Sequence, residues 1–125
     1  MAKFLSDEFY GELQGALSSD PKWTEATSGV KTSILLSSTD TGSTYLISVD
    51  SGTTKIQKAE KGSAAEFSFE GSYDAWTKVA KGELDLQAAV LKGQLKFKGS
   101  ITKILMYRDR FMRIAEILKG LPKDY

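Results

Sequence analysis

The chain contains no cysteine and no histidine in its 125 residues. Without cysteine it forms no disulfides and offers no thiol nucleophile. Without histidine it lacks the commonest general base, the base of a Ser-His-Asp triad and the usual ligands of zinc sites. The remaining reactive side chains (Asp, Glu, Lys, Tyr, Ser and Thr) form no catalytic pattern along the sequence. The sequence therefore predicts a protein that is not an enzyme and that holds neither a metal nor a cofactor.

Long hydrophobic runs are also missing. No run approaches the ~18 apolar residues that a membrane-spanning helix needs. The first residues, MAKFLSDEFYG, lack the apolar centre of a secretory signal. We therefore expect a cytoplasmic protein. Its length suits a single domain over residues 1–125.

Acidic residues are scarce only at the C-terminal end. Residues 1–30 carry a net charge of −3 and residues 31–90 a net charge of −2, whereas residues 91–125 carry nine basic and three acidic side chains, a net +6. Such a basic end suits an anionic membrane surface or a phosphate-bearing ligand, or it is an ordinary solvated helix face. Nucleic-acid binding is not expected, because the basic residues are not interleaved with exposed aromatic residues for base stacking.

Two short helices are predicted at the N-terminus. Ser6 precedes two acidic residues, a pattern typical of a helix start because the side-chain oxygen accepts a backbone N–H and the helix dipole favours acids. We expect this helix to run to about Leu17. Asp20 is predicted to cap a second helix, with Pro21 at the first position, where its missing N–H costs nothing. Gly29 is expected to end that helix.

Three strands are predicted next, over 30–37, 45–49 and 53–58, with tight turns at 40–42 and 50–52. The third strand has Ile56 as its only large apolar residue, which is typical of an edge strand. The two Asp-x-Gly turns lack the regularly spaced acids and the final Glu of an EF-hand loop. They are therefore interpreted as turns and not as calcium sites.

The C-terminal half is predicted to alternate strands and helices, because its apolar residues recur first every second and then every third or fourth position. The expected elements are a strand over 65–70, helices over 72–80 and 85–91, a strand over 94–98, and a helix over 100–121 that bends near 106–107. The whole order predicts an α+β fold with a single five-stranded mixed sheet and helices packed on one face. A helical connection as long as the one before the fifth strand normally joins parallel strands, so we expect the fourth and fifth strands to run parallel.

Three segments of this half carry a family resemblance. They are Phe69–Trp76 (FEGSYDAW), Lys81–Ala89 (KGELDLQAA) and Lys92–Ser100 (KGQLKFKGS). In order and spacing they resemble the strand, short helix, Gly-plus-acidic turn, small-residue helix and second strand of the sterol carrier protein type-2-like lipid-transfer domains. The N-terminal half is similar to that family only in its helix-then-meander plan.

The resemblance implies an apolar cavity, or tunnel, between the sheet and the helices. It implies non-enzymatic binding and transfer of fatty acids, fatty acyl-CoA or sterol-like lipids. The chain ends in Leu-Pro-Lys-Asp-Tyr and not in a Ser-Lys-Leu type of ending, so a peroxisomal role is not carried over. The residues expected to contact the ligand are Phe69, Trp76, Leu84, Val90, Phe97, Ile101, Leu105, Phe111 and Met112.

Two alternatives stay open. An ordinary hydrophobic core would need the same apolar residues, whether or not a ligand binds among them. Related domains also occur fused to enzymes, so the chain is alternatively a structural, dimerisation or substrate-shielding module that works with a lipid-handling enzyme. Under either function a transient anionic membrane surface and a homodimer are candidate partners.

Overall fold

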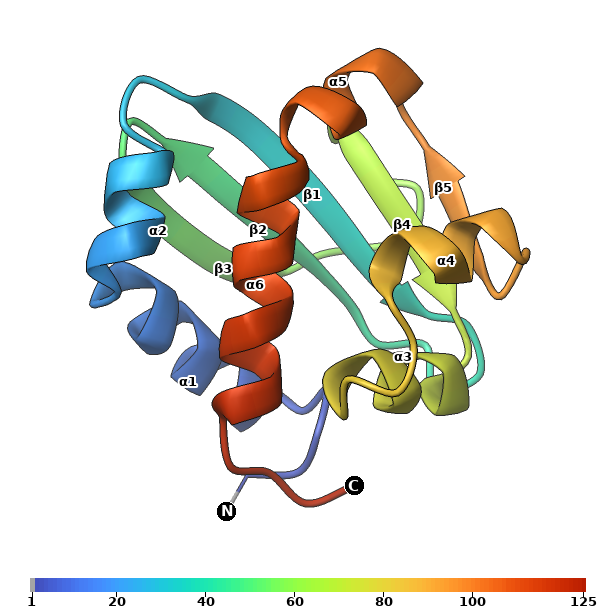
Figure 1. Cartoon of the computed structure of the whole chain (residues 1–125). Helices are drawn as coiled ribbons and strands as arrows, with labels where there is room; N and C mark the ends of the chain where they lie inside the picture. Colours follow the sequence, from blue (N-terminus) through green and yellow to red (C-terminus); the bar gives the residue numbers. More distant parts are fainter. Residues whose placement is uncertain (1) are drawn as a thin grey trace.

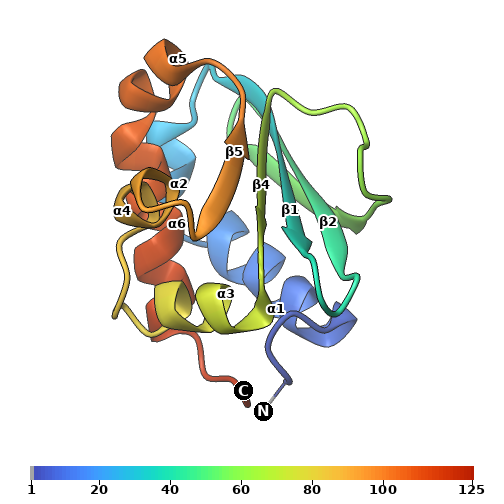
Figure 2. The same cartoon turned by 90° about the vertical axis from the view of Figure 1, so that its right-hand side faces the viewer.

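The computed structural model describes residues 2–125 and contains one five-stranded sheet with all of its helices on one face (Figures 1 and 2). The order of the strands across the sheet is β3-β2-β1-β4-β5. The strands are β1 (Lys31–Ser38), β2 (Thr44–Asp50), β3 (Thr53–Lys58), β4 (Phe67–Gly71) and β5 (Leu95–Lys98). The predicted α+β class and the single mixed sheet are therefore confirmed.

The first three strands form the expected antiparallel meander, with Ile34 opposite Ile47 and Ile47 opposite Ile56. The only parallel pair among the described strands joins β1 and β4, with Leu36 beside Phe69. After β3 the chain crosses the sheet face that carries no helices and then enters β4 (Figure 2). This crossing is fixed by the Ser33 hydroxyl, which accepts a 2.9 Å hydrogen bond from the Glu66 backbone N–H.

The prediction of parallel β4 and β5 is wrong, because the two strands are antiparallel. The two helices between these strands are too short to carry the chain back along the length of β4. They return it to the same end of the sheet at which β4 ends. Gly71, the last residue of β4, pairs with Leu95, the first residue of β5. A Cβ atom at Gly71 would lie 2.3 Å from the Leu95 side chain, so glycine allows β5 to begin directly beside the end of β4.

Each helix except the last begins at a residue whose side chain accepts a backbone N–H. These residues are Ser6 and Asp20, as predicted, together with Ser72, Asp85 and Ser100 at the starts of the predicted C-terminal helices. The helices are α1 (Asp7–Ser18), α2 (Pro21–Ala26), α3 (Tyr73–Ala80), α4 (Leu86–Leu91), α5 (Ile101–Met106) and α6 (Arg108–Gly120). The predicted bend near 106–107 is a full break at Tyr107 between α5 and α6.

The core lies between the sheet and the helices. Its largest fully buried side chains include Phe9, Leu13, Trp23, Phe67 and Phe69. The Trp23 indole N–H donates a 2.8 Å hydrogen bond to the Thr54 hydroxyl on β3, so the one polar atom of this buried ring is satisfied. The N-terminal helices α1 and α2 are thereby fixed over the β3 side of the sheet.

Arginines fix helix α6 to helix α2. The Arg113 guanidinium donates hydrogen bonds of 2.8 and 2.6 Å to the two carboxylate oxygens of Asp20. Arg110 donates a 2.8 Å hydrogen bond to the carbonyl of Ala26 at the end of α2. The hydrogen bonds from Arg113 and from the backbone of Trp23 hold the pKa of Asp20 below its usual value, although partial burial opposes them. Arg110 and Arg113 therefore belong to the interface between α6 and α2 and not to a solvated helix face.

This ion pair gives a pH-dependent prediction. Because the native pKa of Asp20 is depressed, its carboxylate stabilises the fold above the unfolded-state pKa of about 4, and this stabilisation is lost as the pH falls through the lower native pKa. Asp20→Asn keeps a residue able to cap α2 but removes the charge. We expect a Tm lower by a few degrees near pH 7 and no difference from the wild type near pH 2, measured by circular dichroism.

The matched control is Asp50→Asn, which removes the same charge from an exposed strand end with no ion pair in the described residues. It should leave the Tm nearly unchanged at neutral pH. Equal losses for Asp20→Asn and Asp50→Asn would show that net charge, and not the contact with Arg113, sets the difference.

Candidate functional site

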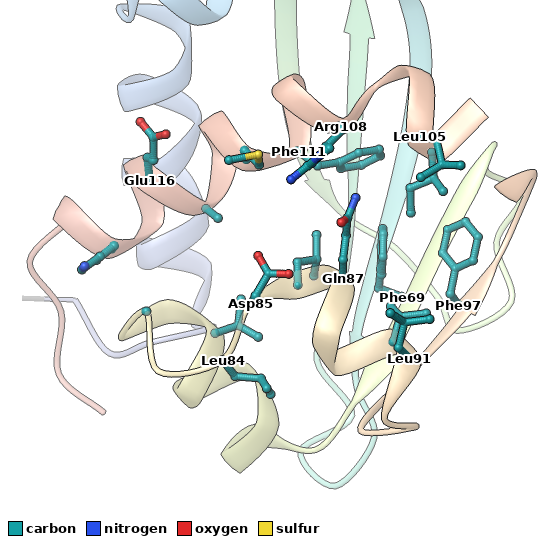
Figure 3. A pocket seen from close by; sticks show the side chains of 18 of the residues that line it. Phe69, Leu84, Asp85, Gln87, Leu91, Phe97, Leu105, Arg108, Phe111 and Glu116 are labelled. Atoms are coloured by element: carbon teal, nitrogen blue, oxygen red, sulfur yellow. The ribbon is translucent and has the colours of Figure 1, made fainter. Parts of the chain in front are cut away.

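A cavity of about 380 Å³ lies between the β4–β5 side of the sheet and the helices α4, α5 and α6 (Figure 3). Its floor is aromatic. Phe69 on β4 lies 5.1 Å from Phe97 on β5 and 5.8 Å from Phe111 on α6, measured between ring centroids. The cavity forms because the short α4 and the broken α5–α6 pair stand above these rings without filling the space between them.

Eight of the nine residues predicted from the sequence line this cavity. They come from β4, the α3–α4 connection, α4, β5, α5 and α6, so the fold brings together side chains that lie far apart along the chain. In chain order they are Phe69, Leu84, Val90, Phe97, Ile101, Leu105, Phe111 and Met112. Whether they contact a ligand stays a prediction.

Trp76 is the ninth residue, and the structure places it elsewhere. It lines a separate space of about 40 Å³ beside the main cavity, which also touches Phe69 and Phe111. Its side chain is buried, and its indole N–H donates a 2.9 Å hydrogen bond to the carbonyl of Ser37. Trp76 therefore packs α3 against the end of β1 and stands one layer behind the cavity wall.

The sequence-based site omits polar residues that also line the cavity, namely Asp85, Gln87, Arg108, Glu116 and Lys119. A usable signal exists for part of this set. Arg108, Phe111, Met112, Ala115 and Lys119 recur every third or fourth residue along α6, so they share one helix face. Selecting residues by apolar character alone finds the middle of that helix face and misses Arg108 and Lys119 at its two ends.

Two of these charged groups have structural partners. The Asp85 carboxylate caps α4 through the backbone N–H of Ala88, and Glu116 accepts a 2.8 Å hydrogen bond from Arg113. Arg108 and Lys119 differ, because neither side chain makes an ion pair in the part of the chain that the structure describes. In Figure 3 the Arg108 and Gln87 side chains extend toward one another from α6 and α4. Two cationic groups are thus available at a cavity whose lining is mostly apolar.

The family of this chain is established by a match to a protein-family model. Residues 13–111 match the model of the SCP-2 sterol transfer family. The chain belongs to this family. The match ends at Phe111, so the four α6 residues that complete the cavity wall, Met112, Ala115, Glu116 and Lys119, follow the matched region.

Solved structures with the same fold support the assignment. A crystal structure of sterol carrier protein 2 superposes with a TM-score of 0.83 at 17% identity, covering 96% of this chain and 100% of that one. The solution structure of a conserved hypothetical protein of Thermus thermophilus, described as possibly a sterol carrier protein, gives 0.81 at 16% identity, covering 99% of this chain and 93% of that one. At these identities the similarity establishes the fold alone. No curated protein matches the sequence.

Part of a larger enzyme is also similar. The sec-alkylsulfatase Pisa1 from Pseudomonas sp. gives a TM-score of 0.55 at 17% identity over 82% of this chain, which corresponds to 14% of the Pisa1 chain. The SCP-2 fold thus recurs within a much longer protein.

The described residues 2–125 include no cluster of three or more metal-ligating side chains. Within the same residues, no helix combines the length and the apolar character needed to cross a bilayer. The lining of the cavity combines apolar side chains with a few hydrogen-bonding and charged groups.

Gly99 sets the position of α5 over the cavity. Its φ is +142°, and an added Cβ would lie 2.9 Å from the Glu66 carbonyl oxygen and 3.0 Å from the Phe67 ring. β5 can therefore turn into α5 directly against β4 only with glycine at this position. The turn is reinforced by Lys103, whose ammonium group lies 2.8 Å from the Glu66 carboxylate.

We predict that Gly99→Ala lowers the free energy of unfolding by about 3 kcal/mol or more, from backbone strain together with a clash against fixed backbone. The matched control is Gly93→Ala, where φ is +75° and nothing lies within 4 Å. That substitution should cost only the left-handed strain of roughly 1–2 kcal/mol. Urea unfolding measures both, and equal costs would contradict the role assigned to the close contact at Gly99.

Proposed function

We propose that the cavity binds fatty acids, fatty acyl-CoA or sterol-like lipids, and that the protein transfers them without chemical change. The observation that carries this proposal is an apolar cavity of about 380 Å³ in a chain of the SCP-2 sterol transfer family. The predicted cytoplasmic location and homodimer stay predictions.

Burial of an acyl chain supplies the driving force. Each methylene removed from water contributes about 0.8 kcal/mol, so a chain of about twelve carbons contributes close to 10 kcal/mol before the cost of association. Useful affinity therefore needs no charged partner. Phe69, Phe97 and Phe111 form a wall of flat, apolar rings against which such a chain can lie.

The polar end of the ligand is proposed to lie near Arg108. A guanidinium group donates paired hydrogen bonds to a carboxylate or a phosphate, which a sterol hydroxyl cannot accept in the same way. The position of Arg108 at the edge of the cavity therefore favours ligands with an anionic head group. Its exposure limits the expected contribution, because water screens the charge.

A cavity-filling substitution tests the site. Ala115 lies on the cavity face of α6, so Ala115→Phe should occupy space that the acyl chain needs. We expect the Kd for a fluorescent fatty acid to rise at least about tenfold, equivalent to about two methylenes left unburied. The Tm should change little, because the added ring enters an existing cavity.

The matched control is Ala64→Phe, at an exposed residue in the crossing segment between β3 and β4. It adds the same ring away from the cavity and should leave the Kd unchanged. Unaltered binding in the Ala115→Phe variant, or no saturable binding in the wild type, would show that this cavity is not the lipid site.

The head-group proposal has its own test. Arg108→Gln should weaken binding of a fatty acid about tenfold, through loss of a charge-assisted hydrogen bond, and should leave the Kd for the fatty alcohol of the same length within about twofold. Competition against a fluorescent probe measures both ligands. A loss that is equal for acid and alcohol would assign Arg108 to the shape of the cavity and not to the head group.

A second candidate function has one supporting observation. The similar region of Pisa1 forms a small part of an enzyme named for its action on alkyl sulfates. By that precedent the chain alternatively shields an apolar substrate for a separate enzyme. Transfer of a labelled lipid between donor and acceptor vesicles by the chain alone favours the carrier, whereas tight binding without transfer favours the shielding module.

A further inference from the structure

The wall of the cavity contains one side chain that is readily oxidised. The chain has no cysteine, so its three methionines carry its only sulfur atoms. Among the described residues 2–125, Met112 is the only methionine that lines the cavity, and no tyrosine or tryptophan lines it. Peroxides convert a thioether to a sulfoxide, which makes an apolar side chain polar. Oxidation at this one position therefore changes the character of the wall.

Met112 is accessible to an oxidant dissolved in water. It is 45% exposed although it lines the cavity, so it lies at the boundary between the apolar space and solvent. A methionine that only fills a gap in a hydrophobic core is shielded by the side chains packed around it. Hydrogen peroxide therefore reaches the sulfur atom of Met112 without any opening of the fold.

The neighbours of Met112 on α6 place it on the path proposed for a bound lipid. Arg108 lies four residues before it and Ala115 three residues after it, and all three residues line the cavity. Residues three and four apart on a helix have Cβ atoms about 5–6 Å apart. Met112 therefore lies between the residue proposed to bind the head group and the position at which Ala115→Phe is expected to block the acyl chain.

We propose that Met112 is a redox-sensitive residue of the cavity, at which oxidation by a peroxide weakens lipid binding. The thioether sulfur attacks one oxygen of hydrogen peroxide, so that an S–O bond forms and the O–O bond breaks. The proton on the transferred oxygen passes to the departing oxygen, which leaves as water. The sulfur is oxidised by two electrons, the peroxide is reduced, and the product is methionine sulfoxide at position 112.

The sulfoxide lowers the affinity for lipid in two ways. Its oxygen is a polar group in a wall against which an acyl chain packs, and a polar group that loses water without gaining a hydrogen bond costs free energy. The Arg108 guanidinium, one helical turn away and without an ion pair in the described residues, is a donor that this oxygen can engage. An Arg108 engaged in this way is less available to a fatty-acid carboxylate. The effect on affinity rests on the proposed function, because it requires the lipid to occupy the cavity.

Met106 is a matched methionine outside the cavity. It is 68% exposed on α5 and is not part of the cavity lining. A peroxide should therefore oxidise Met106 at least as readily as Met112, but without consequence for a ligand in the cavity. The two methionines separate an effect at the cavity wall from general chemical damage.

The experiment treats the full chain with hydrogen peroxide, maps the oxidation of each methionine by mass spectrometry and measures the Kd for a fluorescent fatty acid. Oxidation of the wild type should raise the Kd at least about fivefold. Met112→Leu removes the sulfur and keeps an apolar side chain of similar size, so treatment should not change the Kd of this variant. Met106→Leu should lose affinity on treatment as the wild type does. Reduction by methionine sulfoxide reductases should restore the wild-type Kd.

A bound lipid gives a second readout, because it covers the cavity face of α6. A saturating amount of a saturated fatty acid, which does not itself consume the peroxide, should slow the oxidation of Met112. The oxidation of Met106 should proceed at the same rate with and without the fatty acid. Equal rates at Met112 with and without bound fatty acid would contradict its place on the path of the lipid.

The outcomes distinguish this inference from the proposed function. A Met112 that stays unoxidised while Met106 reacts, or a loss of affinity in Met112→Leu equal to that of the wild type, would overturn the inference. Fatty-acid binding that is unchanged after complete oxidation of Met112 would also overturn it and would leave the proposed function intact. No saturable binding before treatment would instead contradict the proposed function, and with it any effect of oxidation on affinity.

Discussion

The contact on which the cavity depends is the one between α6 and the sheet. Phe111 packs edge-on against Phe67 at 5.4 Å and against Phe69 at 5.8 Å, so one buried ring from α6 is placed between two rings of β4. On its other side α6 is fixed to α2 by Arg113 and Asp20. Anchored at these two places, α6 cannot collapse onto α4, and the space between them stays open.

The same arrangement explains which predictions from the sequence succeed. Helix caps and strand alternation are local signals, so the five caps and the half-buried strands follow from a few neighbouring residues. The direction of β5 relative to β4 depends instead on the end of the sheet at which α3 and α4 deliver the chain to β5. This is a property of tertiary packing that the length of the connection does not specify. Gly71 carries part of this information, because a Cβ at this residue would lie 2.3 Å from the side chain of Leu95, with which it pairs.

The site is predictable from the sequence to the extent that it is apolar. Eight residues selected for their apolar character line the cavity, whereas Trp76 meets the same criterion and packs behind it. Trp76 has an indole N–H that must be satisfied when buried, and Ser37 supplies the acceptor away from the cavity. Arg108 escapes the apolar criterion because its position on the α6 face becomes informative only when α4 is placed opposite to it.

The basic residues of the C-terminal third divide into two groups with different physical roles. Arg110 and Arg113 face α2 and hold the fold together, and Lys103 fixes α5 through Glu66, where its hydrogen bond and that of Thr32 lower the pKa of the Glu66 carboxyl. Lys92, Lys96, Lys98 and Arg108 lie on the segment around the cavity mouth without carboxylate partners in the described residues. The basic end of the chain is therefore in part structural, because its paired bases fix α5 and α6 to the rest of the fold while the others carry no such contact.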